Sequence, residues 1–107
     1  KNLVYAAEKN NVKRIIFTSS VAIYGLNGGK PNEDSPIKPF NDYSESKYQS
    51  EKVFNDWTAR DASRCLVIVR PVVIFGENNR GNVYELLSQI ASGTFVMVGN
   101  GKNCHNF

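Results

Sequence analysis

A tyrosine and a lysine four residues apart, Tyr43 and Lys47, are the side chains in this sequence whose spacing best suits proton-transfer chemistry. They lie in a run of good helix formers, and residues i and i+4 leave a helix on the same face. The pattern therefore predicts an ammonium beside a phenol. A fixed positive charge close to a tyrosine favours the phenolate, so the pair could exchange a proton with a substrate hydroxyl or carbonyl. A tyrosine and a lysine also occur at this spacing by chance in helices of this length, so a purely structural role for Tyr43 and Lys47 stays open.

Three hydroxyl side chains, Thr18, Ser19 and Ser20, come at the end of a segment over residues 14–18 whose Ile-Ile-Phe centre is apolar. A continuous β-branched and aromatic run is typical of a strand buried on both faces of a parallel sheet. A second such run covers residues 65–69 and leads into Arg70-Pro71. Ligands bind beyond the carboxyl ends of parallel strands, so both segments are candidates for a site. Turn and cap chemistry is the alternative for the hydroxyls, and a simple strand stop is the alternative for the proline.

Helical patterns flank the two strands. Residues 2–10 place Leu3, Val4 and Ala7 on one face, and residues 43–60 carry an apolar stripe with Trp57 in a core or a subunit interface. Residues 26–39, rich in Pro, Gly and Asn, predict a loop. A third helix over residues 83–90 with Asn82 as its cap, and a short strand over residues 94–98, are expected further on. Helices alternating with buried strands predict an α/β fold with parallel strands.

The order of these features carries a family resemblance. Strand, hydroxyl cluster, Tyr24-Gly25, Tyr43-x-x-x-Lys47, second strand and Arg70-Pro71 follow one another along the chain. In this combination the chain resembles the extended short-chain dehydrogenase/reductase family, in particular its nucleotide-sugar epimerases and dehydratases. The resemblance implies the C-terminal part of a Rossmann-like, doubly wound parallel sheet over residues 1–78 and the start of a smaller substrate-binding lobe over residues 79–107.

The resemblance also implies roles for single residues. Tyr43 would be the general acid/base, Lys47 would stabilise its phenolate and bind the nicotinamide ribose, and Ser20 would hydrogen-bond the reacting oxygen. Further contacts to the NAD or NADP cofactor would come from Thr18, Ser19, Pro71 and Val72, and contacts to the substrate from Tyr24, Val73, Phe95, Val98 and His105. For Tyr24, a packing role is the alternative to a place in the substrate-side wall. Members that bind UDP-sugars usually carry an arginine where His105 aligns. Histidine lacks the permanent charge and the bidentate fork of arginine, so the implied contact to a diphosphate is weaker here.

The Gly-x-Gly-x-x-Gly turn that holds a pyrophosphate at a helix N-terminus does not occur in this sequence. We therefore expect the chain to be part of an enzyme of about 300 residues, and we expect the isolated 107-residue piece to be inactive. The whole enzyme is expected to be cytoplasmic and homo-oligomeric, and to act on a small molecule, in the first place a nucleotide-sugar.

The composition argues against several other classes of function. Thirteen basic and 10 acidic residues give a net charge of +3, and the basic residues are scattered, unlike the stripe or cluster of a nucleic-acid-binding surface. No apolar run approaches the length of a membrane span. One histidine and two widely spaced cysteines, Cys65 and Cys104, offer neither a metal site nor a disulfide framework.

Two other functions stay open from the sequence. A dehydrogenase or reductase of the same superfamily that acts on a steroid or another apolar alcohol would share Ser20, Tyr43 and Lys47, and would differ in having an apolar pocket. A non-catalytic cofactor-sensing or scaffold protein belongs to another class. It would have no need of these three residues together.

Overall fold

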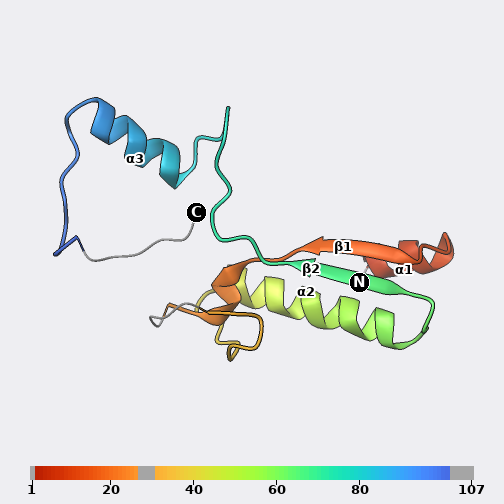
Figure 1. Ribbon diagram of the computed structural model, residues 1–107. Helices are drawn as coiled ribbons and strands as arrows, with labels where there is room; N and C mark the ends of the chain where they lie inside the picture. The colour runs from red at the N-terminus through yellow and green to blue at the C-terminus, as the bar shows by residue number, and fades with distance from the viewer. Residues whose placement is uncertain (1, 27–30, 102–107) are drawn as a thin grey trace. The chain divides into compact units, whose positions relative to one another are not determined.

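The computed structural model describes residues 2–26 and 31–101. In chain order its elements are helix α1 (Asn2–Lys9), strand β1 (Arg14–Thr18), the 3₁₀ helix η1 (Val21–Tyr24), helix α2 (Asp42–Ala59), strand β2 (Cys65–Val69) and helix α3 (Asn82–Ala91) (Figure 1). The chain divides into two compact units, residues 1–72 and residues 73–107. The sequence places its domain boundary six residues later, after residue 78.

Strands β1 and β2 pair in parallel, with Arg14 opposite Cys65 and Thr18 opposite Val69. The connection between them contains α2, so the predicted α/β fold with a parallel helical crossover is confirmed. The pairing continues past the strand ends. The Ser19 amide donates to the Val69 carbonyl at 2.7 Å, and the Val21 amide donates to the Pro71 carbonyl at 3.2 Å.

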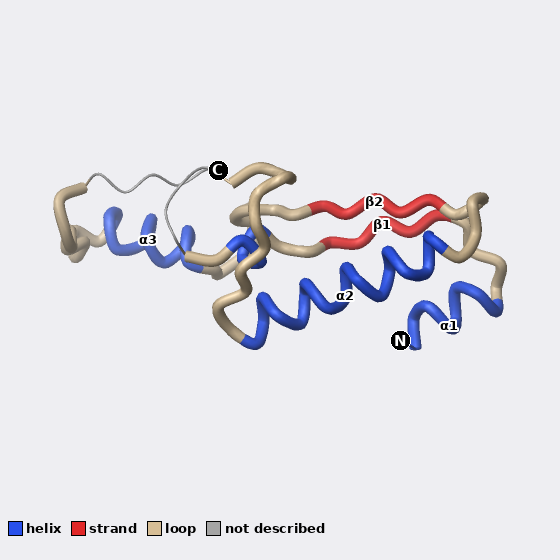
Figure 2. The backbone as a smooth tube through the Cα atoms, turned by 90° about the horizontal axis from the view of Figure 1, so that it is seen from below, coloured by secondary structure: helices blue, strands red, loops and turns tan. Residues whose placement is uncertain are grey.

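The first unit has its core on one face of this sheet. Val4 of α1 and Phe54 and Trp57 of α2 form a buried cluster, and the partly buried side chains Ile15, Phe17, Val53 and Leu66 pack against it. Figure 2 shows both helices on the same side of the strands. Trp57 is fully buried, which confirms its predicted place in a core.

The other face of the sheet is open within the described residues. Exposed and half-buried positions alternate along both strands, and Ile16 is 74% exposed. Alternate side chains point to opposite faces, and only one face of these two strands carries helices in the residues the structure describes. The prediction of burial on both faces is therefore wrong for this chain as described. Leu3, expected on the buried face of the first helix, is also exposed.

Helix α2 starts where it does because of a capping box. The Asn41 side chain accepts from the Ser44 amide at 2.8 Å, and the Ser44 hydroxyl accepts from the Asn41 amide at 3.1 Å. These bonds satisfy backbone donors that a helix N-terminus otherwise leaves free. They place Tyr43 in the first turn of the helix and Lys47 one turn later.

A tight turn at Gly25 closes η1. Gly25 has a φ of 87°, and a Cβ at this position would lie 2.7 Å from the Lys38 carbonyl oxygen. The Lys38 amide also donates to the Ile23 carbonyl at 2.8 Å. A side chain at position 25 would therefore be strained and would push the predicted loop away from η1.

Two of the predictions for the second unit are wrong. Gly81 occupies the N-cap position of α3, where it has no side chain to cap the helix. Asn82, the predicted cap, is the first residue of the helix. Residues 94–98 form no strand, because no described segment hydrogen-bonds with them as a partner strand. Among the described residues, no helix combines the length and the apolar character that crossing a membrane requires.

Candidate active site

One face of α2 carries Tyr43, Lys47 and Glu51 at successive intervals of four residues. The Lys47 ammonium lies 5.8 Å from the ring centroid of Tyr43 and donates to the Thr18 carbonyl at 3.0 Å. The same-face arrangement that the spacing predicts is therefore present. Tyr43 is 54% exposed, so its phenol is open to a ligand, while Lys47 is fixed to the carboxyl end of β1.

Helix α2 carries a second pair with the same spacing, Tyr48 and Lys52. The Lys52 ammonium lies 4.2 Å from the ring centroid of Tyr48, closer than in the first pair. The hydrogen bond of Lys47 to the end of β1 distinguishes the two pairs, since no hydrogen bond from Lys52 to a strand is found among the described residues. The position relative to the sheet, and not the spacing, singles out Tyr43 and Lys47.

The predicted hydroxyls follow β1 directly. The Ser20 hydroxyl accepts from the Ala22 amide at 3.2 Å and caps η1, so the cap chemistry considered as its alternative is present. The Ser19 side chain is buried. Its hydroxyl favours the ionised form of the Glu51 carboxylate, although it forms no hydrogen bond of standard geometry with any described residue. Ser20 lies two residues beyond Thr18, whose carbonyl binds Lys47.

The segment after β2 lies beside these hydroxyls. The carbonyl of Pro71 accepts from the amide of Val21, the residue that follows Ser20, so Pro71 lies at the tip of the first strand as expected. Val72 comes next and is partly exposed. The structure thus brings the residues after both strands to one edge of the sheet.

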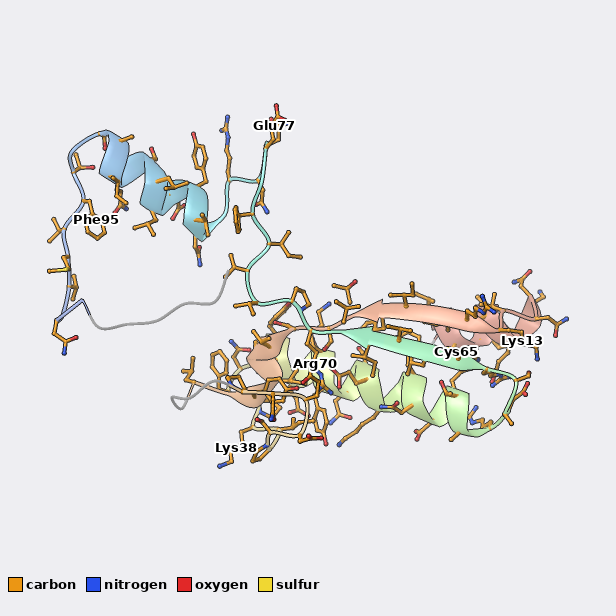
Figure 3. The ribbon with its side chains drawn as sticks, viewed as in Figure 1. Lys13, Lys38, Cys65, Arg70, Glu77 and Phe95 are labelled. Carbon is orange, nitrogen blue, oxygen red and sulfur yellow. The ribbon has the colours of Figure 1, made fainter. Side chains whose placement is uncertain are left out.

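A network that the sequence motifs did not predict joins η1, α2 and the segment after β2 at this edge. Arg70, labelled in Figure 3, follows β2 directly. It binds the Glu51 carboxylate through two bonds, Nε to Oε1 at 3.0 Å and Nη2 to Oε2 at 2.7 Å. Its remaining Nη1 donates to the hydroxyl of Tyr24, and the guanidinium lies 5.2 Å from the centroid of that ring. The one sign of this network in the sequence was the position of Glu51, an acidic residue one helical turn beyond Lys47 on the same face of the predicted helix.

The charges of this network stabilise each other. Burial of Glu51 opposes its ionisation, but hydrogen bonds and charge from Arg70 outweigh burial and hold the pKa of the carboxyl below its ordinary value. The hydrogen bonds to Glu51 likewise raise the pKa of Arg70 above its ordinary value. Both groups are therefore charged at neutral pH, and the bidentate geometry fixes the direction of the guanidinium.

A pocket of about 310 Å³ lies next to this network in the first unit. Its walls include Val21 and Tyr24 of η1, Glu33 of the loop, and Arg70 and Val72 after β2. Tyr24 and Val72, two of the predicted ligand-contacting residues, thus line a cavity.

The other predicted substrate contacts belong to the second unit or to residues that the structure does not describe. Val73, Phe95 and Val98 belong to the second unit, where Phe95 and Val98 are exposed. His105 lies outside the described residues. Groups of His, Cys, Asp and Glu able to hold a metal ion are not found among residues 2–26 and 31–101.

Comparison with known proteins places these features in context. A family model described as the NAD dependent epimerase/dehydratase family matches residues 1–107. The N-acetyl-alpha-D-glucosaminyl-diphospho-ditrans,octacis-undecaprenol 4-epimerase of Escherichia coli O157:H7 is 58% identical over 104 residues, which are 96% of this chain and 31% of that protein. The UDP-glucose 4-epimerase of Vibrio cholerae is 33% identical over 102 residues, 92% of this chain and 31% of that protein.

A solved structure shares the fold. The UDP-Glc/GlcNAc 4-epimerase of Campylobacter jejuni matches with a TM-score of 0.67 and 25% identity over 88% of this chain and 32% of that one. The chain therefore spans about a third of the length of each of these three relatives.

Proposed function

Because the chain belongs to the NAD-dependent epimerase/dehydratase family, as its resemblance to nucleotide-sugar epimerases implied, we propose that the full-length protein is a 4-epimerase of a diphosphate-linked N-acetylhexosamine. The observation that carries this proposal is the 58% identity, over 96% of the chain, to a 4-epimerase with a substrate of that kind. The relatives from V. cholerae and C. jejuni, both 4-epimerases, support the same reaction.

Inverting a carbon that bears a hydroxyl needs a group that moves the hydroxyl proton. Tyr43 is this general acid/base: its side chain is exposed at the start of α2, one turn before Lys47, whose ammonium donates to the Thr18 carbonyl at the end of β1. The Lys47 ammonium lies 5.8 Å from the centroid of the Tyr43 ring. Ser20, at the N-terminus of η1, hydrogen-bonds the reacting oxygen. Proton transfer by such a positioned group contributes typically about 10²–10⁴-fold to the rate.

The residues at this edge fit a nicotinamide cofactor. An ammonium has three donors, and the bond from Lys47 to the Thr18 carbonyl uses one of them, which leaves donors for ribose hydroxyls. Thr18, Ser19, Pro71 and Val72 are the other residues that would hold this end of the cofactor. NAD or NADP, when bound, supplies the hydride acceptor and donor that inversion requires.

The carrier attached to the sugar defines two candidate substrates. The identity to the E. coli relative favours a polyprenol-diphosphate carrier, because that protein's name specifies diphospho-undecaprenol. The relatives from V. cholerae and C. jejuni favour UDP as the carrier. We propose the polyprenol-linked sugar as the substrate, and UDP-N-acetylglucosamine as the second candidate.

The test uses the full-length protein, NAD or NADP, and each of the two candidate substrates in turn, with the configuration at C4 of the product read by NMR. Tyr43→Phe removes the transferable proton and keeps the ring, so turnover should fall about 10²–10⁴-fold while cofactor affinity changes little. Tyr48→Phe is the matched control on the same helix, and it should leave turnover unchanged. Near-normal turnover of Tyr43→Phe would overturn the assignment, and a product unchanged at C4 would overturn the epimerase proposal.

A further inference from the structure

We propose that Glu51, Arg70 and Tyr24 form a brace that holds the turn bearing Ser20 in place against the helix bearing Tyr43 and Lys47. The proposal rests on the function proposed above. Its three members are positioning residues, because they act on the reacting atoms through Ser20. This role is distinct from the substrate contact that the sequence implied for Tyr24.

The brace starts on the catalytic face of α2. Glu51 lies one turn beyond Lys47 and two turns beyond Tyr43, so the same face that presents the Tyr-Lys pair also presents this carboxylate. The Glu51 side chain is 3% exposed. Both of its oxygens bind the Arg70 guanidinium, at 3.0 Å and 2.7 Å. A two-point contact between planar groups fixes orientation as well as distance.

The brace ends on the turn that carries Ser20. Tyr24 is the last residue of η1, and Ser20 caps the first turn of the same short helix. The Arg70 Nη1 donates to the Tyr24 hydroxyl. At the Ser20 end, the Val21 amide donates to the carbonyl of Pro71, the residue after Arg70. The turn is therefore held at both ends by the segment that follows β2.

Substitution of Glu51 can distinguish a positioning role of the brace from direct contact with a ligand. Tyr24 and Arg70 line the pocket, so their substitution could also act through a ligand. Glu51 is buried and does not line that pocket. A change at Glu51 therefore reaches the reaction through Arg70, through the neighbouring Ser19 and through the turn that follows it. Displacement of a positioned group by about 1 Å can lower a rate by about 10².

The experiment is a double-mutant cycle in the full-length enzyme, using Glu51→Gln with and without Ser20→Ala. With Ser20 present, Glu51→Gln should lower kcat about tenfold or more and leave the KM for cofactor unchanged. In the Ser20→Ala background the same change should cost less than about twofold, because coupled residues are non-additive. The control Asp56→Asn neutralises an exposed carboxylate on the same helix and should have no effect in either background. Equal losses in both backgrounds would overturn the proposal, since a general loss of folded protein does not depend on Ser20.

Tyr24→Phe is the second variant, for the case in which Glu51→Gln does not fold. It removes only the oxygen that accepts from Arg70 and should give the same dependence on Ser20. If the wild-type enzyme epimerises neither candidate substrate, the proposed function fails, and crystal structures of the wild type and Tyr24→Phe then decide on the brace. Displacement of residues 20–24 relative to α2 would support it, and an unmoved turn would overturn it.

Discussion

The effect of replacing Trp57 on the free energy of unfolding depends on one buried atom, the indole nitrogen. The side chain is fully buried in the core between α1, α2 and the strands. Its indole N–H has no hydrogen-bond partner among the described residues. Arg64 covers the ring, with its guanidinium carbon 4.9 Å from the ring centroid, but donates to the Trp57 carbonyl instead of interacting with the N–H. Replacement by phenylalanine therefore removes apolar contact and an unsatisfied donor together.

The two effects nearly cancel for Trp57→Phe. The change deletes two buried carbon groups, which costs about 1.6 kcal/mol at about 0.8 kcal/mol each. It also removes a buried unpaired donor, whose desolvation costs about 1–3 kcal/mol. The free energy of unfolding should thus change by between about −0.6 and +1.4 kcal/mol. Trp57→Ala leaves a cavity and should cost about 3–5 kcal/mol.

Urea unfolding of the full-length protein, followed by far-UV circular dichroism, measures both variants. Tyr5→Phe, at an exposed position of α1, is the control and should stay within about 0.5 kcal/mol of the wild type. The two Trp57 variants should differ by more than about 2 kcal/mol. If phenylalanine destabilised the protein as much as alanine does, the indole N–H would have a partner in the folded protein, and the reasoning would be refuted.

Three further predictions concern the site and the chain itself. In the full-length enzyme, Lys47→Ala should lower both turnover and cofactor affinity, whereas Lys52→Ala should lower neither; steady-state kinetics and cofactor titration would show it, and equal effects would contradict the choice of pair. The pKa of Glu51 is lowered in the folded state from 4.5, so the unfolded state takes up its proton first as the pH falls. Its contribution to stability should be complete above about pH 4.5 and lost as the pH falls through the lowered value, and Glu51→Gln should remove this part of the acid dependence in urea titrations. The 107-residue chain alone should bind no NAD(P) at micromolar concentration and should self-associate, through a strand edge or its helix faces; sedimentation and titration that found a cofactor-binding monomer would disprove both.

Local sequence signals determined most of the first unit. The apolar runs gave β1 and β2 at their observed bounds, because β-branched residues without polar alternation favour a strand. The helix expected over residues 43–60 is observed as Asp42–Ala59. Ordered spacing of the Tyr-Lys pair, the hydroxyls and Arg70-Pro71 also implied the family that the comparisons confirm.

Features that depend on a distant partner needed the tertiary structure. Residues 94–98 have strand composition, yet a strand requires a second chain segment for its hydrogen bonds, and no described segment supplies one. Two Tyr-Lys pairs on α2 have the same spacing, and only the packing of α2 against β1 brings Lys47 to the Thr18 carbonyl. The contacts among Glu51, Arg70 and Tyr24 join residues 19 and 46 positions apart. Helix periodicity and strand composition describe neighbours within a few residues, whereas the sheet crossover decides which of these side chains meet.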